Sequence, residues 1–253
     1  MPSSKKAISF DLDGTLTESK SPMTAEMSAL VCQLLEKYYV AVISGGSFPQ
    51  FQKQILSNLP TKSEEILSRL LLFPTNGSAL YMYKDGAWDC LYEEKLTQEE
   101  KNKIIDAWDK ALVQSGVILP TPSYGPVMED RGTQISFSAC GQQAPIAVKA
   151  TWDPNQTERT AIREYMLPLL PEFAISFGGM TSTDVTRAGI DKAHAIEKMM
   201  EYLKVLKDDI MFIGDKLDEG GNDYPAKRTG VECVATTGPE NTAELIKKLI
   251  AEK

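Results

Sequence analysis

Hydrophobic residues near the N-terminus form short apolar runs separated by helical patterns. The segments Ala7–Phe10, Val40–Ile43 and Leu70–Phe73 are almost entirely apolar. Between the first two, apolar residues recur at helical spacing from Met27 to Leu35, after the potential cap residue Thr24. Apolar strands that alternate with amphipathic helices are typical of a parallel sheet covered on both faces. The first part of the chain therefore predicts an α/β fold.

The pattern changes in the middle of the chain. Residues 81–92 read as a hairpin that turns at Asp85–Gly86, and Thr97–Glu100 reads as a capping box that opens a helix. Residues 133–139 alternate between polar and apolar, as half-exposed antiparallel strands do. This stretch predicts a small α+β module.

The first pattern then resumes, with a helix from about Lys192 and an apolar strand at Ile210–Ile213. We therefore predict a discontinuous core, residues 1–84 and 188–253, into which a cap of residues 85–187 is inserted.

The overall composition limits the kinds of partner and the cellular location that we expect. The chain has 253 residues, a formal net charge of −8, and four scattered cysteines without paired spacing. An acidic chain repels nucleic acid, so no nucleic-acid partner is expected. No apolar run approaches the length of a membrane span, and the N-terminus lacks a secretory pattern. We expect a cytoplasmic protein with reduced thiols and no membrane partner.

Three of the predicted strands end in acidic or small polar residues. Asp11 and Asp13 follow the first strand, Ser44 follows the second, and Asp215 follows the strand at 210–213. Ligands of open parallel sheets bind at the carboxyl ends of the strands, so we expect these side chains to converge. Clustered carboxylates repel each other, and Mg²⁺ is the hard cation that suits carboxylate and phosphate oxygens. The sequence therefore predicts a magnesium site.

These residue types together indicate phosphoryl transfer. Asp11 can attack phosphorus to form an aspartyl-phosphate, and Asp13 can serve as general acid and base. Lys192 adds positive charge against phosphate oxygens. Ser44, with the backbone N–H groups of Gly45 and Gly46, supplies hydrogen-bond donors. Each of these motifs alone is common without function; the combination in this order is not.

The motifs resemble those of the haloacid dehalogenase (HAD) phosphatase superfamily. Asp11–Thr17 resembles its nucleophile motif, Ser44 its second motif and Lys192 its third. The acidic residues from Asp215 to Asp223 resemble the fourth. The resemblance covers almost the whole chain. It implies a Rossmann-like HAD core, with a parallel sheet and helices on both faces, and an inserted α/β cap of the kind that mostly acts on sugar phosphates.

A closer resemblance is to the eukaryotic-type phosphomannomutase family. It rests on Asp11–Thr17, Gly45-Gly46-Ser47, Asn76-Gly77, Arg131-Gly132-Thr133, Gly178-Gly179, Ser182, Asp184, Gly189, Asp191-Lys192, Gly214-Asp215-Lys216 and Gly220-Gly221-Asn222-Asp223. The family implies a monomer or a homodimer formed through the cap.

The resemblance also assigns ligands. It implies that Arg131, Ser182 and Asp184 hold a phosphorylated sugar from the cap. It implies that Asp11, the Asp13 backbone carbonyl and Asp215 bind Mg²⁺, with Asn222 and Asp223 shaping the metal loop.

Departures from the family concern its phosphate-binding arginines. This chain has Ser138 and the Val148-Lys149 pair where the family has cap arginines, and Lys20 replaces an arginine that follows the nucleophile motif. A lysine supplies a point charge but lacks the bidentate fork of arginine. Weaker distal binding lets water compete for the phosphoryl group. Sequence alone therefore favours a sugar phosphatase, with phosphomannomutase as the alternative and an inactive binding protein as a third class.

Overall fold

The computed structural model describes residues 5–61 and 63–252, which form two compact units. The first comprises the described residues up to Glu93 and from Ile190 onward; the second is Glu94–Gly189. The inserted module thus begins later than the sequence-based boundary at residue 85, because the second hairpin strand pairs with the sheet of the first unit. At the other end the two boundaries differ by only two residues.

The first unit contains a seven-stranded sheet in the order β11-β10-β1-β2-β3-β4-β5. The five strands from β11 to β3 run parallel, and the hairpin β4–β5 adds two antiparallel strands at one edge. This confirms the predicted α/β core and its mostly parallel sheet. The strands are β1 (Ala7–Asp11), β2 (Tyr39–Ile43), β3 (Leu70–Phe73), β4 (Ala79–Lys84), β5 (Ala87–Glu93), β10 (Ile210–Gly214) and β11 (Glu232–Ala235).

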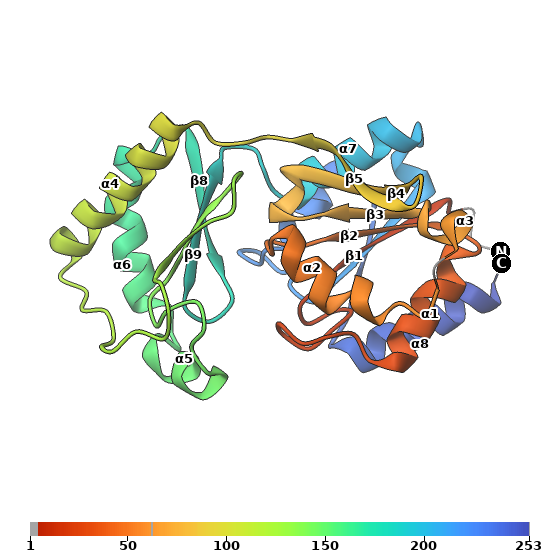
Figure 1. The fold of residues 1–253 in the computed structure, drawn as a ribbon, viewed down its shortest axis with the longest axis horizontal. Helices are drawn as coiled ribbons and strands as arrows, with labels where there is room; N and C mark the ends of the chain where they lie inside the picture. The colour runs from red at the N-terminus through yellow and green to blue at the C-terminus, as the bar shows by residue number, and fades with distance from the viewer. Residues whose placement is uncertain (1–4, 62, 253) are drawn as a thin grey trace. The chain divides into compact units, whose positions relative to one another are not determined.

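Helices cover both faces of this sheet. In Figure 1, α1 and α8 lie side by side along one face and α7 lies on the other. Phe10 and Val42 point into the first layer, and Ala41 and Ile43 point into the layer with α7. Full burial of such a side chain is worth about 1.5–3 kcal/mol, so apolar residues on both faces keep these strands central. The helices of this unit are α1 (Ala25–Leu35), α2 (Phe48–Gln54), α3 (Glu64–Leu67), α7 (Lys192–Leu203) and α8 (Pro239–Ala251), with a 3₁₀ helix, η5 (Tyr224–Thr229).

The second unit pairs a four-stranded antiparallel sheet, in the order β6-β7-β9-β8, with helices on one face. Its apolar face packs on α4 and α6, where the ring of Phe137 stacks on Trp108 with 4.1 Å between centroids. The opposite face carries polar side chains, among them Ser136 and Asp184. The elements are α4 (Gln98–Ser115), β6 (Met128–Asp130), β7 (Ile135–Ser138), α5 (Ile146–Trp152), α6 (Thr157–Met166), β8 (Phe173–Gly178) and β9 (Ser182–Arg187).

Within residues 5–61 and 63–252, no helix combines the length and the hydropathy that crossing a lipid bilayer requires.

Candidate active site

Strand register brings three of the predicted residues to one edge of the core sheet. Asp11, the last residue of β1, pairs in register with Ile43, so Ser44 follows directly beside it. On the other side Phe10 pairs with Ile213, which places Asp215 just past the end of the neighbouring strand. The convergence predicted from the strand ends is therefore present in the first unit.

A buried lysine lies at the centre of this edge. The Nζ of Lys192, on the first residue of α7, donates to Asp11 Oδ1 and to Asp223 Oδ1. Lys192 and Asp223 are fully buried and Asp11 is 2% exposed. Asp191 caps the same helix, because its Oδ1 accepts from Ala193 N at 2.9 Å and holds the first turn of α7 in place. Buried charges of this kind are tolerated only when they are paired.

Burial and neighbouring charges shift the pKa values of these groups. Burial raises the pKa of Asp11 to about 7; Lys192 opposes the shift, and the Asp223 and Asp215 carboxylates add to it. Burial likewise raises the pKa of Asp215 above its usual range, partly offset by Lys216. Burial acts to lower the pKa of Lys192, but the attraction of Asp11 and Asp223 outweighs it, so that pKa is raised. The lysine therefore stays charged.

The three carboxylates form a cluster suited to a cation. Carboxylate oxygens of Asp11, Asp215 and Asp223 lie within 4.8 Å of one another. Two buried oxygens of the cluster, Asp11 Oδ2 and Asp215 Oδ1, have no hydrogen-bond partner. Three carboxylates against one buried ammonium leave excess negative charge, and oxygen ligands of this type are those that Mg²⁺ prefers. The residues present therefore fit a magnesium ion.

A glycine makes the approach of Asp215 possible. Gly14 has φ +90°, and a Cβ built on it would lie 2.6 Å from Asp215 Oδ2. Any side chain here would be strained by the backbone and would push the carboxylate away. The turn that follows β1 at Gly14 thus also leaves room for Asp215.

Asp13 takes a different place from the other carboxylates. It is half-buried and does not belong to the cluster. Its Oδ1 accepts from the backbone N–H of Lys20 at 2.6 Å and from Gln54 Nε2 at 3.0 Å. The Lys20 side chain is exposed. The predicted metal contact from Asp13 concerns its backbone carbonyl and stays a prediction.

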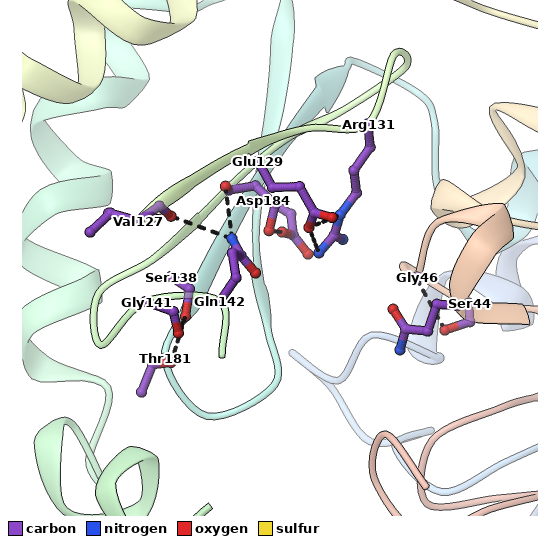
Figure 2. Close-up of polar contacts among 12 residues, drawn as sticks. Ser44, Gly46, Val127, Glu129, Arg131, Ser138, Gly141, Gln142, Thr181 and Asp184 are labelled. Atoms are coloured by element: carbon purple, nitrogen blue, oxygen red, sulfur yellow. Dashed lines mark hydrogen bonds and ion pairs between the residues drawn. The ribbon is translucent and has the colours of Figure 1, made fainter. Parts of the chain in front are cut away.

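The loop after β2 carries Ser44, Gly45 and Gly46. Ser44 is buried, and its Oγ accepts from the Gly46 N–H at 3.3 Å (Figure 2). The carbonyl oxygens of Ser44 and Gly46 accept from Asn76 and Thr75, so that loop is tied to the segment after β3. These contacts hold the small-residue loop beside the end of β1.

The predicted sugar-binding residues of the cap lie in the second unit, and Figure 2 shows two of them, Arg131 and Asp184. The Arg131 guanidinium pairs with Glu129, with 2.8 Å between Nε and Oε2. Asp184 is buried and accepts from Ser136 Oγ at 2.6 Å. Ser182 begins the same strand, β9. All three are therefore located on or next to the cap sheet.

Two further residues, Asn222 and Gln54, differ from what the sequence predicts. Asn222 is exposed, whereas its neighbour Asp223 is buried and also accepts from the backbone N–H of Lys216 at 2.9 Å. Gln54, which contacts Asp13, was missed by the sequence reasoning. A glutamine on an amphipathic helix gives no chemical signal by itself, so only its burial reveals it.

Comparison with known proteins defines the family. The model of the eukaryotic phosphomannomutase family matches residues 27–252. The chain belongs to this family. It is 28% identical to a phosphomannomutase of Spinacia oleracea over 96% of this chain and 95% of the relative. It is 27% identical to a probable phosphomannomutase of Caenorhabditis elegans over 99% and 97% of the two chains.

Solved structures agree on the fold. A Plasmodium falciparum IMP-nucleotidase superimposes with a TM-score of 0.73 at 16% identity, covering 98% of this chain and 71% of that one. A haloacid dehalogenase-like hydrolase from Bacteroides thetaiotaomicron gives a TM-score of 0.62, with 97% and 99% covered. These likenesses confirm the predicted HAD-like fold. The protein is a phosphoryl-transfer enzyme of the HAD fold.

Proposed function

We propose that this protein is a phosphomannomutase, which moves a phosphoryl group between positions 1 and 6 of a hexose through a phosphorylated Asp11. The observation that carries the proposal is the buried arrangement in which Lys192 binds both Asp11 and Asp223 beside Asp215, in a chain that matches the mutase family over both of its units. Sequence reasoning alone favours hydrolysis, and the family match weighs the choice toward the mutase.

The first chemical step needs an ionised Asp11. Lys192 stabilises the carboxylate of Asp11 and orients it through Oδ1, which leaves Oδ2, an oxygen without a hydrogen-bond partner, to attack phosphorus. Asp13 would then protonate the leaving sugar oxygen and later deprotonate the accepting hydroxyl. Ser44 would donate its O–H to the phosphoryl oxygens, together with the N–H of Gly45 and with that of Gly46, which would exchange its 3.3 Å bond to Ser44 Oγ for the phosphate.

A bound Mg²⁺ would offset the repulsion between the anionic carboxylate and the anionic phosphate. Asp215 would hold it through Oδ1, which has no hydrogen-bond partner, Asp11 would contribute the carboxylate oxygen that does not attack phosphorus, and Asp223 lies within the same cluster. Asn222 would act only through the shape of the loop. The remaining work falls to the chain's own charges and hydrogen bonds.

The cap is proposed to select the sugar phosphate. Arg131 would exchange its bond to Glu129 for a phosphate, because a guanidinium binds either partner through paired N–H donors. Ser182 and Asp184 would bind sugar hydroxyl groups, and Lys20 of the core would add positive charge near a phosphate. A homodimer formed through the cap remains part of the proposal, as an alternative to a monomer.

Hydrolysis of a sugar phosphate is the second candidate, and Ser138 is the observation that favours it. Its buried hydroxyl bonds the Gly141 carbonyl at 3.1 Å and Thr181 at 3.2 Å (Figure 2), where the family resemblance expects an arginine. A site that holds the distal phosphate loosely releases the bisphosphate or admits water. The two activities share the same first step and differ in what accepts the phosphoryl group.

Incubation with Mg²⁺ and each of several hexose 6-phosphates, with a catalytic amount of hexose bisphosphate, separates the candidates. Conversion of mannose 6-phosphate to the 1-phosphate, followed by ³¹P NMR, supports the mutase. Free phosphate without the 1-phosphate supports hydrolysis. Lack of both products with every sugar would contradict the proposal and would favour a binding protein.

The nucleophile has its own test. Asp11→Asn should lower turnover of any phosphate ester by roughly 10⁴-fold or more, since the asparagine cannot form the aspartyl-phosphate. The matched control is Asp218→Asn, an exposed acidic residue of the same fourth-motif segment. Retained turnover in Asp11→Asn, with labelled phosphate still bound covalently, would assign the nucleophile to another residue.

A further inference from the structure

One buried glutamine contacts the loop that carries Asp13 at three points. Gln54 is 2% exposed and lies at the end of α2. Its Nε2 lies 3.0 Å from Asp13 Oδ1, 3.3 Å from Thr17 Oγ1 and 3.1 Å from the Ser21 carbonyl oxygen. The two N–H hydrogens of the amide are thus shared among acceptors at the start, middle and end of the same loop.

The chemistry of these partners fixes the orientation of the amide. The Ser21 carbonyl and the Asp13 carboxylate can only accept, and the Thr17 hydroxyl donates to the Leu12 carbonyl. Each of the three therefore requires the nitrogen of Gln54 and not its oxygen. The oxygen, Oε1, then accepts from Gln50 Nε2 at 2.8 Å.

Gln50 also contacts the glycine loop that follows β2. Because Gln50 gives its nitrogen to Gln54, its Oε1 points the other way, toward Gly46. A Cβ built on Gly46 would lie 2.7 Å from that oxygen, so the close approach needs glycine. An ordered series of contacts thus joins the loop of Ser44 and Gly46 to Asp13 through two side chains of one short helix.

We propose that Gln54 is a positioning residue for proton transfer: its amide holds the Asp13 carboxylate and the loop 13–21 in the place from which Asp13 exchanges a proton with the sugar oxygen. This inference rests on the proposed function for the role of Asp13. The transfer itself is unchanged: the O–P bond to the sugar breaks, Asp11 gains the phosphoryl group, and the proton of Asp13 goes to the leaving oxygen. Gln54 touches neither substrate nor phosphorus.

A leaving-group comparison distinguishes this role from a loss of folding. A sugar alkoxide needs the proton of Asp13 as it departs, whereas 4-nitrophenolate departs without one. In Gln54→Leu, kcat/KM for a hexose 6-phosphate should fall by about tenfold to a hundredfold, while kcat/KM for 4-nitrophenyl phosphate changes by less than about threefold. A general structural defect would lower both equally, and that result would overturn the proposal.

Two variants bracket the measurement. Gln50→Leu removes the donor that orients Gln54 but leaves Gln54 in place, so the same selective loss should appear at smaller size. Gln52→Leu makes the same substitution at an exposed position of the same helix and should leave both substrates unaffected. A selective loss in Gln52→Leu as large as that in Gln54→Leu would overturn the proposal.

Hydrogen exchange tests the position of the loop without any substrate. The Lys20 amide donates to Asp13 Oδ1, so its exchange reports whether the carboxylate stays in place. In Gln54→Leu, amides of the segment 13–21 should exchange at least about tenfold faster than in Gln52→Leu, with α8 unchanged in both. Unchanged exchange in Gln54→Leu would refute the inference even if the enzyme proves to be a mutase. If the segment 13–21 exchanges faster in Gln54→Leu but Asp11→Asn retains full turnover, the proposed function is refuted instead of the positioning role.

Discussion

Single buried charges determine how this site works. Lys192 is bound by two carboxylates, and its charge is the reason that Asp11 and Asp223 can be buried side by side. The site still contains more negative than positive charge, and the neighbouring carboxylates of Asp223 and Asp215 add to burial, the main cause, in raising the pKa of Asp11. A cation that joins the cluster would remove this excess and restore the carboxylate that the chemistry needs.

The raised pKa gives a prediction about stability and pH. For a carboxyl whose folded pKa is about 7 against an ordinary value of 3.8, protonation favours the folded state. The metal-free protein should therefore gain stability from Asp11 below pH 3.8 and lose that gain as the pH rises through 7. Urea unfolding between pH 4.5 and 7.5 should show this fall in the wild type relative to Asp11→Asn. Parallel curves for the two proteins would contradict the assigned shift.

Magnesium should reverse the same trend. Because the ion binds the ionised carboxylate, its affinity should rise with pH across this range, and added Mg²⁺ should raise Tm more at pH 7.5 than at pH 5.5. Asp215→Asn should weaken that increase, whereas the exposed Asp218→Asn should not. An equal increase in all three proteins would place the ion elsewhere.

At the scale of elements, helix ends hold much of the functional geometry. Asp191 caps α7 through the N–H groups of Ala193 and His194, and its other oxygen pairs with Arg228 of η5 at 2.5 Å. The helix that presents Lys192 is thereby joined to the 3₁₀ helix that follows Asp223. In the cap, Thr97 and Glu100 form the capping box of α4 that the sequence predicts.

Glu100 has a second role that the sequence does not show. Its carboxylate also binds the Arg187 guanidinium with two contacts of 2.8 Å, and Arg187 donates to the backbone oxygens of Glu94 and Lys95. The hydrogen bonds from Arg187 and from the Thr97 N–H lower the pKa of Glu100 to about 2. One acidic residue thus connects the end of β9 to the start of the cap.

Glu100→Ala should destabilise the second unit by about 1 kcal/mol, the usual cost of losing a helix cap, because alanine has no oxygen to accept from the Thr97 N–H, while the partly exposed ion pair adds little. The lowered pKa means that this contribution is present above pH 4.5 and is lost as the pH falls toward 2. Urea unfolding at pH 7 measures the effect, with Glu99→Ala, exposed in the same turn, as the control. Equal midpoints for the two variants would show that the network does not contribute.

At the scale of the molecule, the chain crosses between its two units at Glu93–Glu94 and at Gly189–Ile190. The core supplies the carboxylates and Lys192, and the cap supplies the groups proposed to bind sugar. In the proposed reaction, the acceptor of the phosphoryl group would depend on the second unit, whereas the first chemical step would depend on the first unit. A mutase and a hydrolase would share the first step and differ in the acceptor that the second unit presents.

Lys149→Arg tests how the cap controls the acceptor. Lys149 lies on α5 directly after Val148, in the segment where the family resemblance expects an arginine, and a guanidinium would bind a distal phosphate bidentately. The ratio of free phosphate to isomerised sugar phosphate should fall by roughly threefold to tenfold. The control is Lys110→Arg, on the exposed side of α4. An unchanged ratio would place Lys149 away from the distal phosphate.

Much of this architecture is readable from the amino-acid pattern. Apolar runs at 7–10, 40–43 and 70–73 mark strands buried on both faces, and the polar residues that end them mark the carboxyl edge of a parallel sheet. The hairpin turn at Asp85–Gly86 is equally readable, because an Asp-Gly pair favours a two-residue turn in which both residues have positive φ. Both residues have positive φ in the structure. Its membership of the core sheet is not, since local pattern cannot tell which sheet a hairpin extends.

By itself, the sequence determines the fold class, the inserted cap and the acidic residues of the site, because these follow from periodicity and from the order of motifs. Only the tertiary structure decides which carboxylates share Lys192, which oxygens have no hydrogen-bond partner, and that Gln54 contacts Asp13. Those properties depend on burial and on contacts between residues up to 181 positions apart. The residues next to each of these positions in the sequence carry no information about its burial or about its distant contacts.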